Sequence, residues 1–358
     1  MGSPETVRLG FVGVGGMGQM AHLRNYVDME GCQVVALAEL RPETGRRVAR
    51  RYGVEKIYAD HEQMLDAEDL DGVVASQPFA RHAVLLPQLY PRVPHLFTEK
   101  PLAVSPEAGR KLTEAAQAAG CVHMVGYHKR SDPATLHAKA VIDEWRESGE
   151  MGDLRYVRIL MPAGDWIAAG FTGLVRTDEP VPPLETEPPD ADMDEPTRQA
   201  YVAFVNYYIH QVNLMRHLLG EPYEIAYAEP AGVLLAVHSA SGVPGAIEMT
   251  PYRTTVDWEE SALIAFEKGY VKLRPPAPLA AARAGTVEVY TDPGEGATPL
   301  RRFPTMPWVH AMRQQAIHFV RVCRGEMPPP CDAAEAAEDL RVARDYIHMR
   351  FAAGREKA

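Results

Sequence analysis

The 358-residue sequence is poor in the features that mark several classes of protein. Its four cysteines include no CxxC pair and no zinc-site spacing, so we expect reduced and mostly buried thiols. No apolar run approaches the roughly 20 residues needed to span a bilayer, and the N-terminus lacks the basic and apolar regions of a signal peptide. The net charge of −11 argues against nucleic acid or an anionic membrane as a partner. These absences favour a cytoplasmic globular protein.

The most informative segment present is a glycine-rich turn that follows the apolar run Val7–Val12. Its sequence is Gly13-Val14-Gly15-Gly16-Met17-Gly18, a helical pattern comes next, and Glu39 stands about 20 residues further on. This order predicts a dinucleotide-binding unit, with a structural glycine turn as the alternative. The first glycine permits the tight turn, the second lets the backbone approach a pyrophosphate, and the last lets the helix pack on the strand. The helix N-terminus then offers N–H groups to the phosphates.

Residues at the ends of the predicted parallel strands are candidates for contact with the cofactor. A carboxylate at Glu39 would accept hydrogen bonds from an adenine ribose, which favours NAD over NADP, although Arg41 nearby would suit a 2′-phosphate. Gln77 and Pro78 follow the fourth strand and should run beside the ribose and nicotinamide. His82 opens the next helix and either approaches the cofactor or is merely structural.

The periodicity predicts two domains of different construction. Residues 1–126 alternate strands with helices, which predicts a Rossmann-type, doubly wound parallel sheet. Its expected strands are Val7–Val12, Cys32–Glu39, Lys56–Tyr58, Gly72–Gln77, His95–Thr98 and Cys121–Val125. Residues 127–358 are richer in strands and predict an open, mostly antiparallel sheet for substrate binding and oligomerisation. The strands expected there are Leu154–Met161, Val233–Ser239, Ala246–Tyr252, Ala262–Phe266, Tyr270–Arg274 and Thr286–Thr291. The last helix is placed in this second domain but is free to pack back towards the first. Between residues 178 and 195 lie eight acidic residues, five prolines and no Lys or Arg, which predicts an extended excursion, either a lid or a surface loop.

A second informative segment is Glu99-Lys100-Pro101, which follows the fifth predicted strand. At that edge of the sheet the Lys100 ammonium would lie near the nicotinamide, with Glu99 holding it or assisting through its charge. A lysine is a useful acid or base when burial or a neighbouring cation lowers its pKa. The alternative is a solvated lysine at a strand end.

Three motifs in order make the chain resemble the glucose–fructose oxidoreductase / inositol dehydrogenase / rhizopine-catabolism (Gfo/Idh/MocA) family. They are the glycine turn, Glu99-Lys100-Pro101, and the run Gly126-Tyr127-His128-Lys129-Arg130-Ser131-Asp132-Pro133. The resemblance covers nearly the whole length. It implies a Rossmann domain and an α/β domain with a large open sheet, a nicotinamide cofactor, redox chemistry on sugars or cyclitols, and dimers or tetramers formed through that sheet.

The family's second catalytic element is a helix carrying Asp-x-x-x-His, often with another Asp three residues later. The matching residues here are Asn206, His210 and Asn213, so the resemblance carries over His210 and Lys100 as catalytic residues while both acidic positions are amides. Spacings of four, three and four place Asn206, His210, Asn213 and His217 on one helix face, which faces either a ligand or an internal hydrogen-bond network. An amide orients a hydroxyl but takes no proton, so we expect Asn206 to orient substrate beside the catalytic pair. No metal site is expected, because no carboxylate or cysteine accompanies the histidines.

Further substrate contacts are expected where the two predicted domains join. His128 and Arg130 begin the connection, and Arg130 either binds a polyhydroxylated or anionic substrate or pairs with Asp132. Trp166 follows the first strand of the second domain and either stacks on a sugar ring or packs in the core. With Lys100 and the residues of the catalytic helix, these make up the predicted substrate site.

Together these observations predict an NAD-dependent dehydrogenase acting on a secondary hydroxyl or ketone of a sugar, cyclitol or sugar derivative. Two alternatives stay open. One is a redox-neutral lyase or hydrolase that holds NAD tightly and oxidises the sugar transiently, which the Asn replacements favour. The other is a non-catalytic NAD- or sugar-binding protein.

Overall fold

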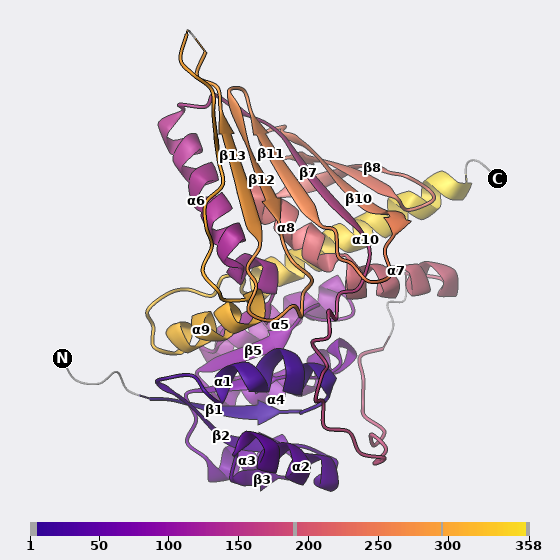
Figure 1. Ribbon diagram of the computed structural model, residues 1–358. Helices are drawn as coiled ribbons and strands as arrows, with labels where there is room; N and C mark the ends of the chain where they lie inside the picture. Colours follow the sequence, from indigo (N-terminus) through magenta and orange to yellow (C-terminus); the bar gives the residue numbers. More distant parts are fainter. Residues whose placement is uncertain (1–5, 189–191, 295, 356–358) are drawn as a thin grey trace. The chain divides into compact units, whose positions relative to one another are not determined.

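The computed structural model describes residues 6–188, 192–294 and 296–355, and the chain divides into two compact units (Figure 1). Unit 1 comprises Met1–Tyr127, Ala169–Ala191 and Met312–Leu340, and unit 2 comprises His128–Ala168, Asp192–Ala311 and Arg341–Ala358. Unit 1 therefore contains two segments that follow the first part of unit 2 in the sequence.

Unit 1 is built on a six-stranded parallel sheet with the order β3-β2-β1-β4-β5-β6. The strands are β1 (Val7–Val12), β2 (Cys32–Ala38), β3 (Lys56–Tyr58), β4 (Gly72–Ala75), β5 (His95–Glu99) and β6 (Val122–Gly126). This is the strand order of a doubly wound dinucleotide-binding fold, with its switch point between β1 and β4. The predicted Rossmann-type sheet is confirmed, and each strand lies within two residues of its expected bounds.

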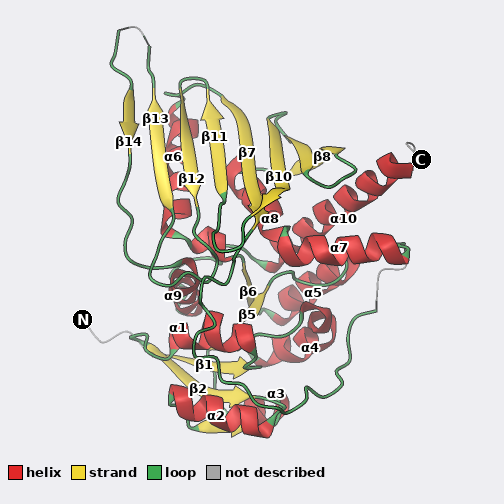
Figure 2. Cartoon of the chain, turned by 45° about the vertical axis from the view of Figure 1, so that its right-hand side comes forward, coloured by secondary structure: helices red, strands yellow, loops and turns green. Residues whose placement is uncertain are grey.

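Helices surround the parallel sheet of unit 1. They are α1 (Arg24–Tyr26), α2 (Pro42–Tyr52), α3 (His61–Ala67), α4 (His82–Leu89), α5 (Pro106–Ala119) and α9 (Ala311–Cys323), and they lie on both sides of the sheet (Figure 2). Two of them, α3 and α5, begin at side-chain caps. The hydroxyl of Ser105 accepts a hydrogen bond from the Ala108 N–H, and Gly120 ends α5 with a φ of 68°. The first helix of the glycine motif starts with a π-helical turn, η1 (Gly18–Leu23).

The core of unit 1 joins the sheet to α9. Phe11, Leu37, Val74 and other buried strand residues form one apolar cluster with Phe319 and Val320. Burial of this apolar area is the main force that holds α9 against the parallel sheet. Helix α9 thus completes the core of unit 1.

Unit 2 is built on an eight-stranded sheet with the order β14-β13-β12-β11-β7-β10-β9-β8. The strands are β7 (Leu154–Ala163), β8 (Tyr223–Ala228), β9 (Leu234–Ser239), β10 (Pro244–Arg253), β11 (Ser261–Phe266), β12 (Gly269–Arg274), β13 (Thr286–Thr291) and β14 (Leu300–Arg302). All neighbours pair antiparallel except β7 and β10, which pair parallel. The predicted large, mostly antiparallel sheet is confirmed, and β8 and β14 are additional strands.

Helices of unit 2 pack on one face of this sheet. The helices of this unit are α6 (Pro133–Ser148), α7 (Glu195–Tyr207), α8 (Ile209–Leu219) and α10 (Ala333–Arg355), of which α10 is shared with unit 1. Helix α6 lies against β12 and β13, α8 lies against β7 and β10, and α7 packs on α8. Asp132 caps α6 by accepting a hydrogen bond from the Ala134 N–H at 2.9 Å. The other face carries half-buried and charged side chains, such as Arg158 paired with Glu248.

One expectation about the helices is wrong. The segment predicted as a single catalytic helix is two helices, because the chain leaves helical hydrogen bonding at Tyr208, between α7 and α8. Asn206 lies near the end of α7, whereas His210, Asn213 and His217 lie on α8. The side chains of positions 206 and 210 are therefore not successive members of one regular helix face.

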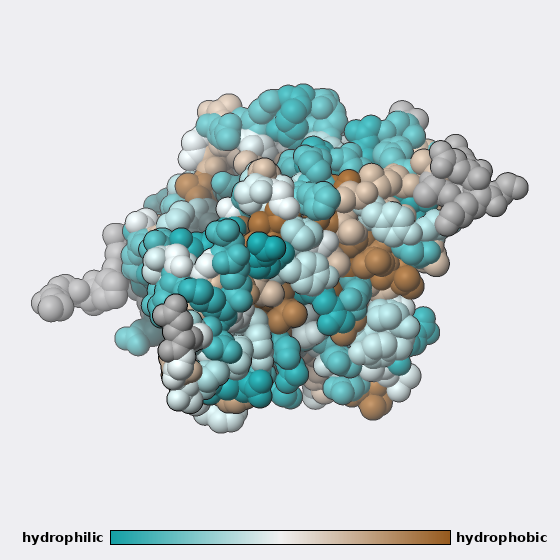
Figure 3. Space-filling view, turned by 90° about the horizontal axis from the view of Figure 1, so that it is seen from above, coloured by the Kyte–Doolittle hydropathy of each residue, from teal (hydrophilic) through white to brown (hydrophobic). Residues whose placement is uncertain are grey.

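The molecular surface drawn in Figure 3 is mostly hydrophilic, with apolar residues in small groups. Among the described residues, no helix combines the length and apolar character required to cross a membrane. The same part of the chain contains no group of three or more His, Cys, Asp or Glu side chains arranged to hold a metal ion.

Candidate active site

Four segments meet at the carboxyl edge of the parallel sheet in unit 1. The glycine turn follows β1, Glu39 follows β2, Ser76-Gln77-Pro78 follows β4, and Glu99-Lys100 ends β5. A cavity of about 360 Å³ opens at this edge. It is lined by Val12, Gly13, Gly15, Ala38, Glu39, Leu40, Arg41, Ala59, Asp60, His61, Ser76, Gln77, Pro78, Arg81, Leu85, Val181, Pro182 and Leu184. Ligands of doubly wound sheets bind at this position, beside the switch point.

Each glycine of the fingerprint is required for a different geometric reason. Gly13 has a φ of 88°, and a Cβ there would lie 2.1 Å from the Gln77 side-chain nitrogen. A Cβ on Gly18 would lie 2.6 Å from the Gly13 carbonyl oxygen, so the helix start packs closely on the turn. A Cβ on Gly15 would meet nothing within 4 Å. Gly15 therefore faces open space, as expected of the position where a backbone approaches a ligand.

Glu39 is tied to the glycine turn and to Arg41. Its Oε2 accepts hydrogen bonds from the Val14 N–H at 3.0 Å and from Arg41 Nη2 at 3.1 Å. Its Oε1 accepts from the Arg41 N–H at 3.2 Å and from Arg41 Nε at 2.7 Å. A carboxylate has about four acceptor positions, so all are used here. The Glu39 hydrogen bond is also the largest cause that raises the pKa of Arg41.

Gln77 and His82 hold neighbouring backbone in place. The Gln77 amide donates to the Val12 carbonyl at 3.1 Å and accepts from Arg81 at 3.3 Å, so it links β1 to β4 at the switch point. His82 is fully buried and its Nδ1 is 2.9 Å from the Leu102 carbonyl oxygen. Burial lowers the pKa of His82 to about 4, so the ring is neutral. His82 does not line the described cavity, which favours the structural reading of this residue.

Glu99 is held by a histidine that sequence reasoning did not single out. His22 Nε2 lies 2.8 Å from Glu99 Oε1, and Glu99 Oε2 accepts the Lys100 N–H at 3.2 Å. Burial raises the pKa of Glu99, but the hydrogen bond and charge of His22, with the charge of Lys100, outweigh it and leave the pKa below its usual value. His22 lies on the π-helical turn η1. Lys100 is half-buried and precedes a cis peptide bond to Pro101.

In unit 2, the residues before α6 form a buried ionic network that also escaped sequence reasoning. Lys129 Nζ lies 2.5 Å from Glu260 Oε2, and both side chains are almost completely buried. Gln211 of α8 donates to Glu260 Oε1 at 2.8 Å, and Trp258 Nε1 donates to Oε2 at 3.3 Å. Satisfied on both oxygens, Glu260 anchors the turn that carries His128 and Arg130 to helix α8.

The same turn brings two predicted substrate residues against α8. The rings of His128 and His210 meet edge to face with centroids 4.5 Å apart. Arg130 is buried, and its Nε donates to Asn213 Oδ1 at 2.6 Å. Arg130 therefore bonds Asn213, and His128 packs on His210, on the same helix α8. These contacts are those of an internal network, and the ligand alternative for this helix face stays a prediction. Asn206 is exposed at the end of α7.

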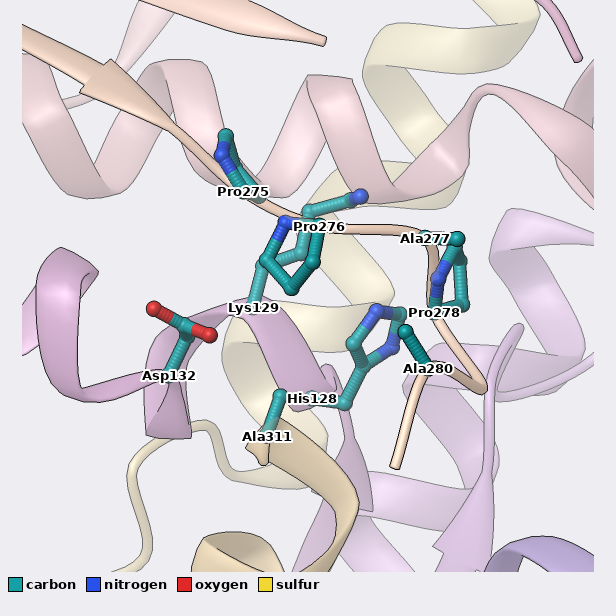
Figure 4. A pocket seen from close by; sticks show the side chains of 9 residues that line it. All are labelled: His128, Lys129, Asp132, Pro275, Pro276, Ala277, Pro278, Ala280 and Ala311. Atoms are coloured by element: carbon teal, nitrogen blue, oxygen red, sulfur yellow. The ribbon is translucent and has the colours of Figure 1, made fainter. Parts of the chain in front are cut away.

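The remaining candidates of unit 2 are His217 and Trp166, and His128 also lines a small cavity. His128 and Lys129 lie beside the loop Pro275–Ala280 around a cavity of about 10 Å³, which is too small for a sugar (Figure 4). Burial, followed by the charges of Arg130 and other cations, holds the pKa of His217 well below its usual range. Trp166 is half-buried in the turn after β7, where its carbonyl accepts the Leu279 N–H at 3.2 Å.

The residues of unit 1 fit a dinucleotide. The cavity has a glycine backbone open to a ligand at Gly15, a carboxylate at the end of β2, and apolar walls, while the N-terminus of the following helix adjoins the turn. These are the elements that bind pyrophosphate, ribose and base in doubly wound folds. Lys100 belongs to unit 1 and His210 to unit 2.

The fold and the cavity define unit 1 as a Rossmann-type unit with the features of a dinucleotide site. Residues 7–127 match the family model described as "Oxidoreductase family, NAD-binding Rossmann fold", which is Gfo/Idh/MocA. Over this segment the chain resembles the family, as the sequence motifs predict. An oxidoreductase is the class of enzyme that the family model describes.

Relatives and solved structures agree with this family. Scyllo-inositol 2-dehydrogenase (NAD(+)) of Bacillus subtilis is 26% identical over 68% of this chain and 66% of its own length. Inositol 2-dehydrogenase of Burkholderia lata is 27% identical over 80% of each chain. Inositol 2-dehydrogenase of Rubrobacter xylanophilus is 32% identical over 39% of this chain and 41% of its own length. The chain thus spans less than two thirds of some of these relatives, although alignments with others are longer.

Similar folds cover the whole chain. An oxidoreductase from Desulfitobacterium hafniense, described as NADPH-dependent, has a TM-score of 0.76 at 15% identity and covers 100% of this chain and 97% of that one. Scyllo-inositol dehydrogenase from Lactobacillus casei, solved with NAD(H) and scyllo-inositol, has a TM-score of 0.67 at 16% identity and covers 98% of each. At these identities the similarity shows the fold.

Proposed function

We propose that this protein is an NAD-dependent dehydrogenase that oxidises a secondary hydroxyl of a sugar, cyclitol or sugar derivative, or reduces the matching ketone. The observation that carries the proposal is the common sheet edge of unit 1, where the open glycine turn, the β2 carboxylate and Lys100 follow three different strands. The named inositol dehydrogenases among its relatives support polyols as the substrate class.

The bound nicotinamide would supply a hydride acceptor or donor, and the chain's own residues would handle the proton. A lysine ammonium beside the reacting carbon can hydrogen-bond the substrate oxygen and exchange its proton with it. Glu99 accepts the Lys100 N–H and is itself held by His22, so the backbone at the lysine is anchored to η1.

His210 is the second proposed proton-handling group. Its ring is packed against His128, and the adjacent Asn213 is held by Arg130. We place Asn213, His128 and Arg130 as groups that orient substrate hydroxyls, with Asn206 and Trp166 at the periphery. Because Asn213 is an amide, it orients a hydroxyl without taking its proton.

The cofactor preference depends on the Glu39–Arg41 pair. For Glu39 to accept hydrogen bonds from both ribose hydroxyls, at least one of its bonds to Arg41 must break. A released Arg41 would be free to meet a 2′-phosphate. We propose NAD as the cofactor, because Glu39 follows β2 and lines the cavity, where the ribose is expected. Glu39→Gln should lower the affinity for NAD and raise the relative affinity for NADP, whereas Arg41→Ala should weaken NADP alone.

The decisive experiment is a screen of sugars and cyclitols that follows NADH absorbance with and without added cofactor. Lys100→Met should lower kcat by roughly a hundredfold or more while the Kd for NAD stays unchanged. Lys111→Met, which removes an exposed lysine of α5, is the matched control. A wild-type protein that neither binds NAD(H) nor turns over any member of the panel contradicts the proposal.

A specific observation supports a second candidate, a redox-neutral lyase or hydrolase with tightly held NAD. The acidic positions of the family's catalytic helix are Asn206 and Asn213, and Asn213 is engaged by the buried Arg130. Cofactor that co-purifies, and turnover without net NADH, would select this candidate in the same screen.

We further propose that the protein assembles as a homodimer or homotetramer through the open face of the second sheet. The half-buried residues Tyr156, Leu160 and Leu263 lie at the centre of that face on β7 and β11. Light scattering tests this assembly, and Leu263→Glu should shift the mass towards the monomer.

A further inference from the structure

The acidic, proline-rich part of the sequence contributes a segment to unit 1 that no cofactor motif predicts. We call residues 169–188 the strap. It has no regular helix or strand. The strap begins more than 40 residues after Tyr127, where the first part of unit 1 ends. Residues 189–191, which belong to the extended excursion predicted from the sequence, lie outside the described part of the chain.

The strap begins over the glycine turn. The ring of Phe171 approaches the Cβ position of Gly16 at 3.7 Å. Gln19, which is buried in the first turn after the motif, donates to the Val175 carbonyl at 3.2 Å and accepts the Val175 N–H at 3.0 Å. Gln19 also donates to the Val14 carbonyl at 2.8 Å, so one amide ties the strap to the fingerprint itself.

Two carboxylates of the strap cap helices of the Rossmann sheet. Glu179 accepts the Glu43 N–H at 2.9 Å and the Thr44 N–H at 2.6 Å, at the N-terminus of α2. These backbone bonds outweigh desolvation and hold the pKa of Glu179 below its usual value. An anion at a helix N-terminus is stabilised by the unpaired N–H groups and the helix dipole.

The second cap lies at the far end of the strap. Glu187 accepts the Val104 N–H at 3.0 Å, the Ser105 N–H at 3.0 Å and the Ser105 hydroxyl at 2.7 Å, at the start of α5. Its own N–H donates to the Ala80 carbonyl at 2.6 Å. The strap is therefore fixed on both sides of the stretch between residues 179 and 187.

That stretch forms a wall of the cofactor cavity. Val181, Pro182 and Leu184 line the same cavity as Glu39 and Pro78. In a doubly wound fold the carboxylate at the end of β2 binds the ribose in the adenosine half of the cofactor. An aromatic base in such a pocket is normally held between apolar side chains, and here the strap supplies three of them.

We propose that the strap is part of the cofactor site: Val181, Pro182 and Leu184 cover the adenosine half of the bound dinucleotide, and Glu179 and Glu187 clamp them there. The cofactor then dissociates only when the strap lifts from the N-termini of α2 and α5. The strap thereby sets the rate of cofactor exchange. This inference rests on the proposed function, because it requires that the cavity binds NAD.

The test measures the rate and equilibrium of NAD release by wild-type protein and by three strap variants. Leu184→Ala removes part of the wall, and Glu179→Gln removes a clamp. Asp178→Asn is the matched control, because it deletes the same charge at the exposed neighbouring position. Stopped-flow fluorescence gives the release rate, and hydrogen exchange of the peptide that covers residues 178–188 reports on the strap itself.

We expect Leu184→Ala and Glu179→Gln to release NAD about tenfold faster than wild type, a change within the range of one lost contact. Asp178→Asn should behave as wild type, and added NAD should slow exchange in the strap peptide of the wild type. Equal release rates in all variants overturn the proposal. Tighter NAD binding by Leu184→Ala and Glu179→Gln also overturns it, because it would mean that the strap obstructs the site. Wild-type protein that binds no NAD refutes the proposed function instead, a result that the wild-type arm alone reveals.

Discussion

Gly15→Ala separates the cofactor role of the glycine turn from its structural role. A Cβ at this position meets no atom within 4 Å, and Gly15 is not among the residues with positive φ. The folded chain therefore accommodates alanine without strain. Since alanine also restricts the unfolded chain, the free energy of unfolding should stay equal or rise by about 0.4–1 kcal/mol.

The same methyl group should obstruct a pyrophosphate. Phosphate oxygens bound by the backbone lie about 2.9 Å from the N–H nitrogens, and a Cβ on Gly15 would stand in that space. We expect the Kd for NAD to rise about 10- to 100-fold, equivalent to roughly 1.4–2.7 kcal/mol. Titration calorimetry measures the affinity, and urea unfolding without cofactor measures stability.

Gly18→Ala is the control with the opposite signature. Its Cβ would lie 2.6 Å from the Gly13 carbonyl oxygen, so backbone must shift and stability should fall by about 1–3 kcal/mol. If Gly15→Ala binds NAD as tightly as wild type, or loses as much stability as Gly18→Ala, the placement of the pyrophosphate over Gly15 is refuted.

Two further predictions concern buried ion pairs. Because the pKa of Glu99 is depressed in the folded state, its pairing with His22 stabilises the protein above the ordinary carboxyl pKa of 4.5 and is lost as the pH falls below it. His22→Phe removes the main cause of the depression, so burial then raises the pKa of Glu99. Melting temperatures measured from pH 4 to 7 should then show that the variant begins to lose stability at a higher pH than the wild type does. An unchanged pH profile would count against the pairing. Lys129→Met leaves the charge of Glu260 buried and should cost about 3–5 kcal/mol in urea unfolding. The double variant with Glu260→Gln should recover part of that loss, and no recovery would show that the two side chains do not act as a pair.

Strands with a strong apolar pattern were predictable from the sequence. β1 and β13 have the predicted bounds, Val7–Val12 and Thr286–Thr291, because buried side chains and adjoining glycine or proline turns mark their ends. β8 and β14 carry little such signal: β14 is exposed along its length, and β8 mixes polar and apolar side chains. Their pairing with neighbouring strands, rather than their own composition, makes them strands.

Site residues followed the same division between local and long-range information. The glycine turn and the position of Lys100 after β5 depend on short segments and were predicted. The role of His22 depends on a partner 77 residues away and on a π-helical turn, neither of which a periodic pattern reveals. The break at Tyr208 likewise escaped, because the spacing of the polar residues is helical on both sides of it.

The strap shows why composition is a poor guide to position. Eight acidic residues and five prolines between residues 178 and 195 indicate a solvated segment. Most of the described side chains between these two positions are exposed. Two of its carboxylates nevertheless find the N-termini of α2 and α5, where helices present unpaired N–H groups. Those partners exist only after the Rossmann sheet has formed, so the sequence predicted the charge but not its partner.

The contacts within unit 1 connect the glycine turn to the lysine loop through one short helix. The helix that begins at Gly18 carries His22, which holds Glu99, and Glu99 accepts the N–H of Lys100. A π-helical turn fixes the direction of His22, and such turns are frequent at functional sites. These two hydrogen bonds connect the helix after the glycine turn to the backbone of Lys100. We expect a shift of the turn to move the loop of Lys100 with it.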